Sequence, residues 1–213
     1  MRESAVLHRV KQGYTTGARS LASRSIVGLT RTRVTPNALT TAGVSLCLAA
    51  SVVVFFEYRG AWLFYWLGAF LFVVGSILDI LDGALARAGG KTTPFGAFLD
   101  STTDRVGEAA MLGSIALIFH RYDYPVALAL AFAGVAGSLL VSYTRARAEA
   151  LGLKGDVGIG SRAERVVVIT AGLVLAPISI WLLVAAISLL TATAWITVVQ
   201  RILFVRKQLA VRP

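Results

Sequence analysis

The sequence predicts an all-α membrane protein with six transmembrane helices and an amino-terminal amphipathic helix at the membrane interface. Hydrophobic residues make up 56% of the 213 residues and charged residues only 15%, whereas soluble domains carry about a quarter charged residues. Six apolar stretches follow one another, and four of them comfortably reach the roughly 20 residues that a spanning helix needs. The lysines and arginines gather at alternate ends of these stretches.

The first 36 residues form a segment of their own. They carry seven lysines and arginines among apolar residues, a composition typical of a helix along lipid headgroups; a disordered basic tail is the alternative. They lack the short apolar core of a secretory signal peptide. Thr35-Pro36-Asn37 marks the boundary, because proline favours a helix start and Asn37 is a good N-cap. Residues 37–213 then form one six-helix transmembrane domain, which we expect to be catalytic.

Six spans are expected within this domain. The apolar stretches lie near residues 37–56, 61–85, 96–119, 124–146, 164–178 and 179–203. The fifth is short, and Pro177 separates it from the sixth. Of the 21 lysines and arginines, only Arg59 and Arg121 fall in loops assigned to the outer side. Because basic residues concentrate in cytoplasmic loops, we expect both termini to be cytoplasmic and the protein to lie in the cell membrane.

Composition argues against two kinds of function. Cys47 is the only cysteine, so neither an intramolecular disulfide nor a cysteine-based metal site is possible. The net charge of +10 is compatible with nucleic-acid binding. In a chain this hydrophobic we attribute the charge to loops that face anionic lipid, and we expect no nucleic-acid partner.

Four aspartates lie inside or beside the predicted spans. Asp79 and Asp82 are three residues apart and Asp100 and Asp104 are four apart, so each pair shares one face of a helix. The two helices are consecutive, and a short loop rich in glycine and threonine lets them lie antiparallel with the pairs opposed. Charged groups at membrane depth are costly, so these aspartates indicate function.

Four opposed carboxylates would repel one another, and divalent cations would relieve that repulsion. Oxygen ligands without histidine or cysteine suit Mg²⁺ or Mn²⁺, and we expect two ions. The alternative is a proton path, or structural ion pairs with Arg87 and Arg105. Two arginines cannot neutralise four carboxylates, and Glu108 adds a further acid one turn from Asp104. Metal binding is therefore favoured.

Residues around the aspartates complete a pattern of fixed spacing. It runs Asp79-x2-Asp82-Gly83-x2-Ala86-Arg87-x8-Gly96-x3-Asp100-x3-Asp104. Small residues such as Gly83 and Gly96 let a planar base or a diphosphate approach the backbone, and Arg87 offers a guanidinium to phosphate oxygens. At all eight fixed positions the pattern resembles the signature of the CDP-alcohol phosphotransferase family.

This resemblance covers essentially the whole chain. It implies a membrane-embedded enzyme that moves a substituted phosphate from a CDP-alcohol to a second alcohol and releases CMP, and it favours a homodimer. It implies that the four aspartates surround the metal and that Asp104 accepts a proton. It further implies contacts to CDP-diacylglycerol from Asn37, Thr40, Asp79, Asp82, Gly83, Ala86, Arg87, Thr93 and Gly96.

Three arginines at helix ends are candidates for binding the acceptor. Arg145, Arg165 and Arg201 lie at the cytoplasmic ends of the fourth, fifth and sixth spans, and near Asp104 their guanidiniums would make a phosphate pocket. The surrounding residues resemble the phosphatidylinositol-phosphate synthases of actinobacteria and similar archaeal enzymes, at Arg147 to Ala150, Gly155-Asp156, Glu164-Arg165 and Gln200-Arg201. Where those enzymes commonly carry a second Glu-Arg pair, this chain has Ser161-Arg162.

This second resemblance implies inositol 1-phosphate as the acceptor and phosphatidylinositol phosphate as the product. Glycerol-3-phosphate, which would give phosphatidylglycerophosphate, is the alternative within the class, since it needs a phosphate pocket as well. A divalent-metal or proton-coupled transporter is the alternative from another class. Such transporters often have inverted repeats and broken helices, and we find neither in the sequence.

Overall fold

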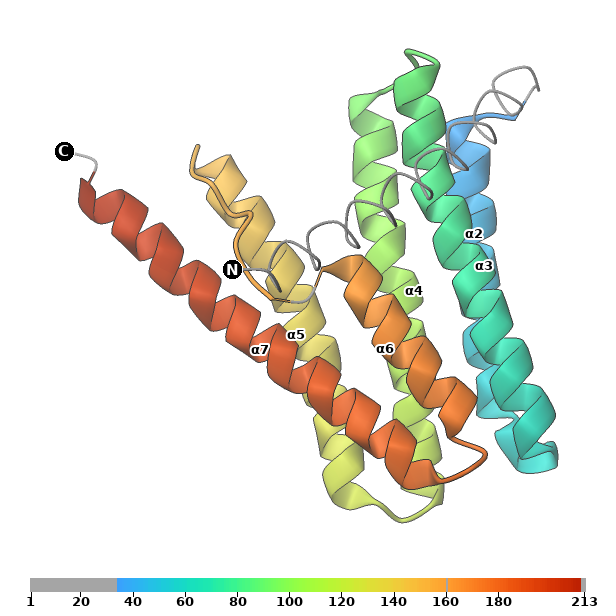
Figure 1. Ribbon diagram of the computed structural model, residues 1–213. Helices are drawn as coiled ribbons and strands as arrows, with labels where there is room; N and C mark the ends of the chain where they lie inside the picture. The colour runs from blue at the N-terminus through green and yellow to red at the C-terminus, as the bar shows by residue number, and fades with distance from the viewer. Residues whose placement is uncertain (1–33, 160, 212–213) are drawn as a thin grey trace, which may run out of the picture.

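The computed structural model describes residues 34–159 and 161–211, so the amphipathic helix predicted at residues 1–36 lies almost wholly outside the described part. The regular structure of the described residues is entirely helical (Figure 1), which confirms the all-α prediction. Six α-helices occupy the six predicted stretches, and α7 runs further than expected. They are α2 (Pro36–Phe55), α3 (Ala61–Ala88), α4 (Pro94–Arg121), α5 (Pro125–Ala150), α6 (Arg162–Leu175) and α7 (Ile180–Val211), with a short 3-10 helix at Glu57–Arg59.

The start of α2 differs from the prediction. Thr35 is the N-cap: its backbone is extended and its side chain accepts a hydrogen bond from the N–H of Ala38 at 3.2 Å. Pro36 opens the helix, because its fixed φ suits the first turn and its missing N–H is not needed there. The residue before a proline is itself biased towards extended backbone. The prediction of Asn37 as the N-cap was therefore wrong by two positions.

Of the six α-helices in the described residues, four are long and apolar enough to cross a membrane: α2, α3, α5 and α7. The other two do not qualify by length and composition. Helix α4 carries several charged residues among its apolar ones, and α6 has only 14 residues. Both still contribute to the common core, in which Met111, Ile115, Ile169 and Leu173 are fully buried.

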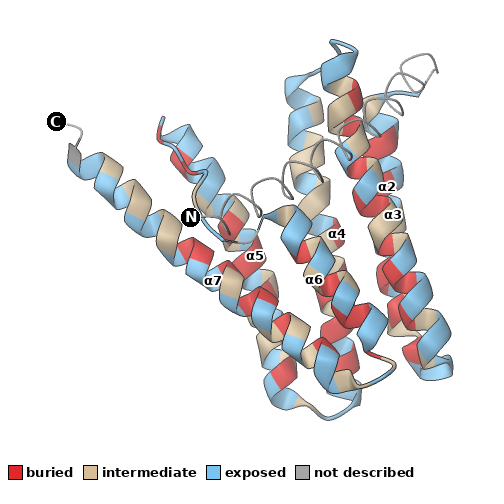
Figure 2. Cartoon of the chain, viewed as in Figure 1, coloured by how far each residue is buried: buried red, intermediate tan, exposed pale blue. Residues whose placement is uncertain are grey.

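The residues of the main apolar core lie mostly in the half of the bundle away from the α3–α4 turn, where Figure 2 shows buried residues on several helices. At the end of the bundle away from the α3–α4 turn, Glu57 is 1% exposed and forms an ion pair with Arg121. The Arg121 guanidinium also lies over the rings of Phe55 and Tyr58, 4.9 and 4.5 Å from their centroids. The apolar core and this ion pair occupy one half of the bundle. The polar residues predicted to form the site lie in the other half, near the α3–α4 turn.

Helices α2 and α3 touch through their backbones. A Cβ on Gly43 would lie 2.9 Å from the carbonyl oxygen of Gly75, and a Cβ on Gly75 would lie 2.7 Å from the carbonyl oxygen of Gly43. Only glycine allows this approach. The contact lies one turn from Thr40 on α2 and from Asp79 on α3, so it sets the two helices around the polar half.

Near the α3–α4 turn, α5 and α7 diverge from α3 and α4 (Figure 1). The loop between α5 and α6 runs back along α7 and is fastened to it. Thr197 donates to the carbonyl of Ile159, and the Nε of Arg201 donates to the carbonyl of Val157 at 2.8 Å. Gly158 has a φ of 132°, and a Cβ there would collide with Thr197, so glycine is required at this position.

Candidate active site

Three of the four predicted metal ligands come together between α3 and α4. Asp79, Asp82 and Asp100 each offer a carboxylate oxygen, and these oxygens lie within 4.8 Å of one another. Asp79 and Asp82 are 8% and 3% exposed and lie one turn apart on α3, and Asp100 joins them from α4. The two acid-bearing helices thus bring their carboxylates together, as the spacing of the acids predicted.

This acidic trio fits a divalent cation. Oxygens about 2.1 Å from Mg²⁺ in an octahedron lie about 3.0 Å apart when adjacent and about 4.2 Å apart when opposite. The three carboxylate oxygens lie within 4.8 Å of one another, so small side-chain rotations would let them share one such ion. Carboxylates without histidine or cysteine suit Mg²⁺ or Mn²⁺. Asp82 is held from behind by Thr40, whose hydroxyl donates a hydrogen bond to its carboxylate.

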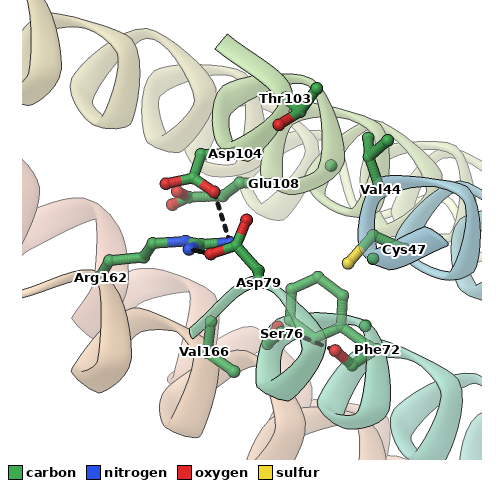
Figure 3. A pocket seen from close by; sticks show the side chains of 13 residues that line it. Val44, Cys47, Phe72, Ser76, Asp79, Thr103, Asp104, Glu108, Arg162 and Val166 are labelled. Atoms are coloured by element: carbon green, nitrogen blue, oxygen red, sulfur yellow. Dashed lines mark hydrogen bonds and ion pairs between the residues drawn. The ribbon is translucent and has the colours of Figure 1, made fainter. Parts of the chain in front are cut away.

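The fourth aspartate, Asp104, has a different partner. Arg162 reaches from the start of α6 into the gap between α3 and α4, and its Nη2 lies 2.6 Å from a carboxylate oxygen of Asp104. The same guanidinium forms an ion pair with Asp79 through Nη1 (Figure 3). No role was predicted for Arg162. It belongs to the Ser161-Arg162 pair, at which this chain departs from the pattern of the enzymes it resembles.

A cavity of about 140 Å³ opens beside the acidic trio, between α2, α3 and α4. We call it the α2–α4 cavity. Eight of the nine residues predicted to contact the CDP-lipid line it: Asn37, Thr40, Asp82, Gly83, Ala86, Arg87, Thr93 and Gly96. The ninth, Asp79, faces a smaller cavity that also contains Asp104 and Arg162, which we call the junction cavity.

The two glycines of the α2–α4 cavity make room for polar side chains. A Cβ on Gly83 would lie 3.2 Å from the guanidinium of Arg87, and a Cβ on Gly96 would lie 3.0 Å from the hydroxyl oxygen of Thr93. Both contacts are tighter than most side chains tolerate. Thr93 is also the N-cap of α4, and its hydroxyl oxygen accepts a hydrogen bond from the N–H of Gly96 at 2.9 Å.

A larger cavity, about 630 Å³, lies between α4 and the ends of α5, α6 and α7. We call it the α4–α7 cavity. The three arginines predicted to bind the acceptor phosphate, Arg145, Arg165 and Arg201, all line it, as does Asp104. Helices far apart in the sequence thus bring three cations to one polar space, which is large enough for a small hydroxylated phosphate ester.

Arg165 is 7% exposed and is held by Glu108 of α4. Its Nε and Nη2 donate to the two oxygens of the carboxylate at 2.7 and 2.9 Å, the forked geometry in which arginine and carboxylate pair most strongly. Ser138 of α5 donates to the same carboxylate at 2.8 Å. Glu108 therefore ties together three helices and fixes Arg165 at the cavity wall.

The other two arginines are held more simply. Arg145 is exposed and pairs with Glu149 one turn along α5 at 2.9 Å. Arg201 donates to two backbone carbonyls, those of Val157 in the α5–α6 loop and Val141 in α5. Arg201 thus also fastens the loop that forms one wall of the cavity, a role that the sequence did not indicate.

A sequence signal for Arg162 was available. Ser161-x-x-Glu164 is the pattern of a capping box, and the structure forms one: the N–H of Ser161 donates to the carboxylate of Glu164 at 2.5 Å, and the N–H of Glu164 donates to the hydroxyl of Ser161 at 3.4 Å. The predicted span began at residue 164. The capping box starts the helix at Arg162 and so places that side chain in the first turn.

The sequence profile of the CDP-alcohol phosphatidyltransferase family matches residues 33–205. The chain belongs to this family of transferases. An archaetidylinositol phosphate synthase from Pyrococcus horikoshii is 36% identical to it over 209 residues, which are 97% of each chain.

The fold is similar to that of the Mycobacterium tuberculosis phosphatidylinositol phosphate synthase in two crystal structures. The structure with CDP-DAG bound has a TM-score of 0.75 and 31% identity, over 87% of this chain and 94% of that one. The structure in complex with manganese and citrate has a TM-score of 0.76 and 30% identity, over 87% and 88%.

These similarities decide between the classes of function left open by the sequence. Membership in a phosphatidyltransferase family favours an enzyme over an ion transporter. The manganese in the mycobacterial enzyme, together with the acidic trio, supports a divalent-metal site in this chain. The protein is a membrane-helical phospholipid-synthesising transferase of that family.

Proposed function

We propose that this protein transfers the phosphatidyl group of CDP-diacylglycerol to inositol 1-phosphate, producing phosphatidylinositol phosphate and CMP. One observation carries the proposal. The residues predicted to bind the nucleotide and the arginines predicted to bind the acceptor phosphate line two separate cavities, and the four aspartates lie between these cavities. An enzyme that joins two substrates needs this arrangement, because each must reach the reacting phosphorus from its own side.

The α2–α4 cavity is the proposed site of the CDP headgroup. Its glycines have no side chains that would fill the cavity, and Arg87 supplies a cation for phosphate oxygens. Asn37 and Thr93 supply further polar groups. The mycobacterial relative has been crystallised with CDP-DAG, which supports the same lipid here. Mg²⁺ or Mn²⁺, as two ions held by Asp79, Asp82, Asp100 and Asp104, would neutralise the diphosphate and stabilise the departing CMP.

The residues of the chain then carry out a direct displacement. A hydroxyl oxygen of the acceptor attacks the lipid-linked phosphorus and forms a new P–O bond. The bond from that phosphorus to the bridging oxygen breaks, and CMP leaves with the electron pair. Asp104 lines the acceptor side and takes the proton of the attacking hydroxyl. A covalent intermediate on the protein is not required.

The choice of inositol phosphate rests on the α4–α7 cavity and on the relatives. Arg145, Arg165 and Arg201 supply three guanidiniums, for which an acceptor without phosphate offers no anion. Relatives of this chain are named as synthases of inositol-phosphate lipids. Glycerol-3-phosphate carries a phosphate as well, so it is the competitor that an experiment must test.

The proposed setting is the plasma membrane. All six helices of residues 37–213 would cross it, including α4 and α6, with both termini and the α3–α4 turn in the cytoplasm, as the distribution of basic residues predicts. Residues 1–36 would lie along the headgroups as an amphipathic helix. The active form would be a homodimer, for which glycine- and alanine-rich spans are suited.

A panel of acceptors tests this function. Purified protein in detergent would be given CDP-diacylglycerol, Mg²⁺ and one of four acceptors: inositol 1-phosphate, free inositol, glycerol-3-phosphate or serine. We expect CMP release with inositol 1-phosphate and none when EDTA is present. Preference for glycerol-3-phosphate would keep the reaction class and refute the proposed acceptor. Equal use of inositol and its phosphate would refute the phosphate pocket.

A further inference from the structure

Among the described arginines, Arg162 is the one that forms ion pairs with the predicted metal ligands, because its guanidinium pairs with both Asp79 and Asp104. It is the first residue of α6, and the capping box between Ser161 and Glu164 fixes the turn from which it projects. From there its guanidinium reaches carboxylates on two other helices, Asp79 of α3 and Asp104 of α4 (Figure 3). About a third of its side chain is exposed, so it is not sealed into the core.

Arg162 also connects two spaces. It lines the junction cavity together with Asp79 and Asp104, and it lines the α4–α7 cavity together with the proposed acceptor arginines. Arg87 lines only the α2–α4 cavity, and Arg145, Arg165 and Arg201 line the α4–α7 cavity without reaching the junction cavity. Arg105 also lines the α4–α7 cavity, but among the described arginines only Arg162 lines both that cavity and the junction cavity.

The proposed reaction places the transferred phosphorus in this same gap. This phosphorus is the lipid-linked one of the diphosphate, and it must lie between the bridging oxygen that leaves with CMP and the hydroxyl that gives its proton to Asp104. Arg162 contacts both carboxylates, so it lies within reach of a phosphoryl group held between them. Phosphoryl transfer spreads negative charge over the nonbridging oxygens of that group, and positioned cations stabilise this charge.

We propose that Arg162 is a catalytic residue that binds the nonbridging oxygens of the phosphoryl group during transfer. This inference rests on the proposed function. In the displacement, the acceptor oxygen bonds to phosphorus, the bond to CMP breaks with its electrons on CMP, and the proton passes to Asp104. Arg162 gives up no proton and forms no covalent bond. It exchanges a carboxylate contact for phosphoryl oxygens, which a planar fork of donors matches well.

Two other roles make different predictions. A purely structural ion pair would hold α6 against α3 and α4, and its loss would lower thermal stability. A fourth contact to the acceptor phosphate would change the KM of the acceptor and leave kcat alone. A residue that acts in the transition state lowers kcat and leaves both KM values nearly unchanged.

The test compares Arg162→Ala, Arg162→Gln and Arg162→Lys with the wild type. Arg147→Ala is the matched control, because Arg147 is exposed on α5 and lines neither cavity. CMP release would be measured with both substrates varied, using whichever phosphorylated acceptor the wild type prefers. We expect kcat to fall by about 100- to 1000-fold in Arg162→Ala, with intermediate activity in Arg162→Lys and wild-type activity in Arg147→Ala.

Two further measurements separate the roles. Millimolar guanidinium added to Arg162→Ala should restore part of kcat, and it should not restore Asp104→Asn. Calorimetric titration of CDP-diacylglycerol micelles, in the presence of Mg²⁺, should give the same affinity in Arg162→Gln as in the wild type. The unfolding temperature reports whether each variant is folded, and Arg162→Lys keeps the test usable if the alanine variant does not fold.

The outcomes distinguish the inference from the function on which it rests. If the wild type releases no CMP with any acceptor, the proposed function fails. If the wild type is active and Arg162→Ala keeps its kcat, or changes only the KM of the acceptor or the Mg²⁺ requirement, the catalytic role of Arg162 is refuted. Loss of activity that parallels a loss of thermal stability in all three variants, without guanidinium rescue, would reassign Arg162 to a structural role.

Discussion

The two cavities beside the aspartates, the α2–α4 cavity and the α4–α7 cavity, differ in whether their charged side chains are paired within the protein. In the α2–α4 cavity the carboxylates of Asp82 and Asp100 face the lumen, and no ion pair reaches either of them among the described residues. In the α4–α7 cavity, each arginine that we propose to bind the substrate phosphate already donates to a group of the protein. These groups are Glu149, Glu108 and backbone carbonyls. One side presents carboxylates that form no ion pair within the described residues, although Arg87 and Lys91 line the same cavity, and the other presents arginines fixed in place.

This difference follows from what each side is expected to bind. A divalent cation brings enough charge to offset several carboxylates, so the acids need no cation from the protein. A phosphate ester is recognised by donors in a set geometry, and an arginine held by a carboxylate loses less freedom on binding. On the α2–α4 side, activity should therefore be most sensitive to the loss of a carboxylate charge. On the α4–α7 side, it should be most sensitive to changes that let an arginine move.

The largest effect is expected on the acidic side. Asp82→Asn and Asp100→Asn should each lower turnover by at least about a hundredfold, because a neutral amide cannot replace a carboxylate as a metal ligand. CMP release would be followed with saturating substrates at several Mg²⁺ concentrations, and EDTA should abolish it. Full activity in EDTA, or in both variants, would show that the acids do not hold an essential metal.

The next effect is on stability, and it contrasts the two carboxylates that hold arginines. Glu108→Ala should destabilise the protein by about 3–5 kcal/mol, because it removes the carboxylate that pairs with the buried guanidinium of Arg165. Glu149→Ala removes an exposed partner of Arg145 and should cost at most about 1 kcal/mol. Thermal unfolding in detergent would compare the two, and equal losses would contradict this contrast.

A third prediction separates the substrates of the two cavities. Arg145→Ala should raise the KM of inositol phosphate by about tenfold, the loss expected when one charged hydrogen bond is removed. Arg87→Ala should instead raise the KM of CDP-diacylglycerol, and Gly83→Leu should do the same because a side chain there meets Arg87. If Arg87→Ala changed only the acceptor KM, the assignment of the two cavities would be reversed.

The smallest effect concerns the third helix attached to Glu108. Ser138→Ala removes one hydrogen bond to the carboxylate and leaves Arg165 in place, so we expect a loss of about 0.5–1.5 kcal/mol in stability. The KM of inositol phosphate should rise only slightly. A loss as large as that of Glu108→Ala would mean that Ser138, and not the Arg165 pair, determines the position of Glu108.

Local patterns predicted the six helices and which acids share a helix face, although the predicted cluster of four aspartates is a trio in the structure. Spacings of three and four residues place side chains on one face of any α-helix, so Asp79 with Asp82, and Asp100 with Asp104, could be paired without knowledge of the packing. Long apolar stretches predicted the helices from local composition alone, and the capping box at Ser161 would have predicted the start of α6. The N-cap of α2 was misassigned because two residues on either side of Pro36, Thr35 and Asn37, have suitable side chains.

The sequence by itself therefore determined an all-helical membrane protein, its acid-bearing helix pair and its reaction class, because these depend on composition and short spacings. Only the tertiary structure decided that Asp104 pairs with Arg162, that Glu108 holds Arg165, and that Arg201 fastens the α5–α6 loop. These contacts join residues 44 to 60 positions apart. They depend on how the helices cross and diverge, which is set by close packing between helices, such as that of Gly43 on α2 against Gly75 on α3.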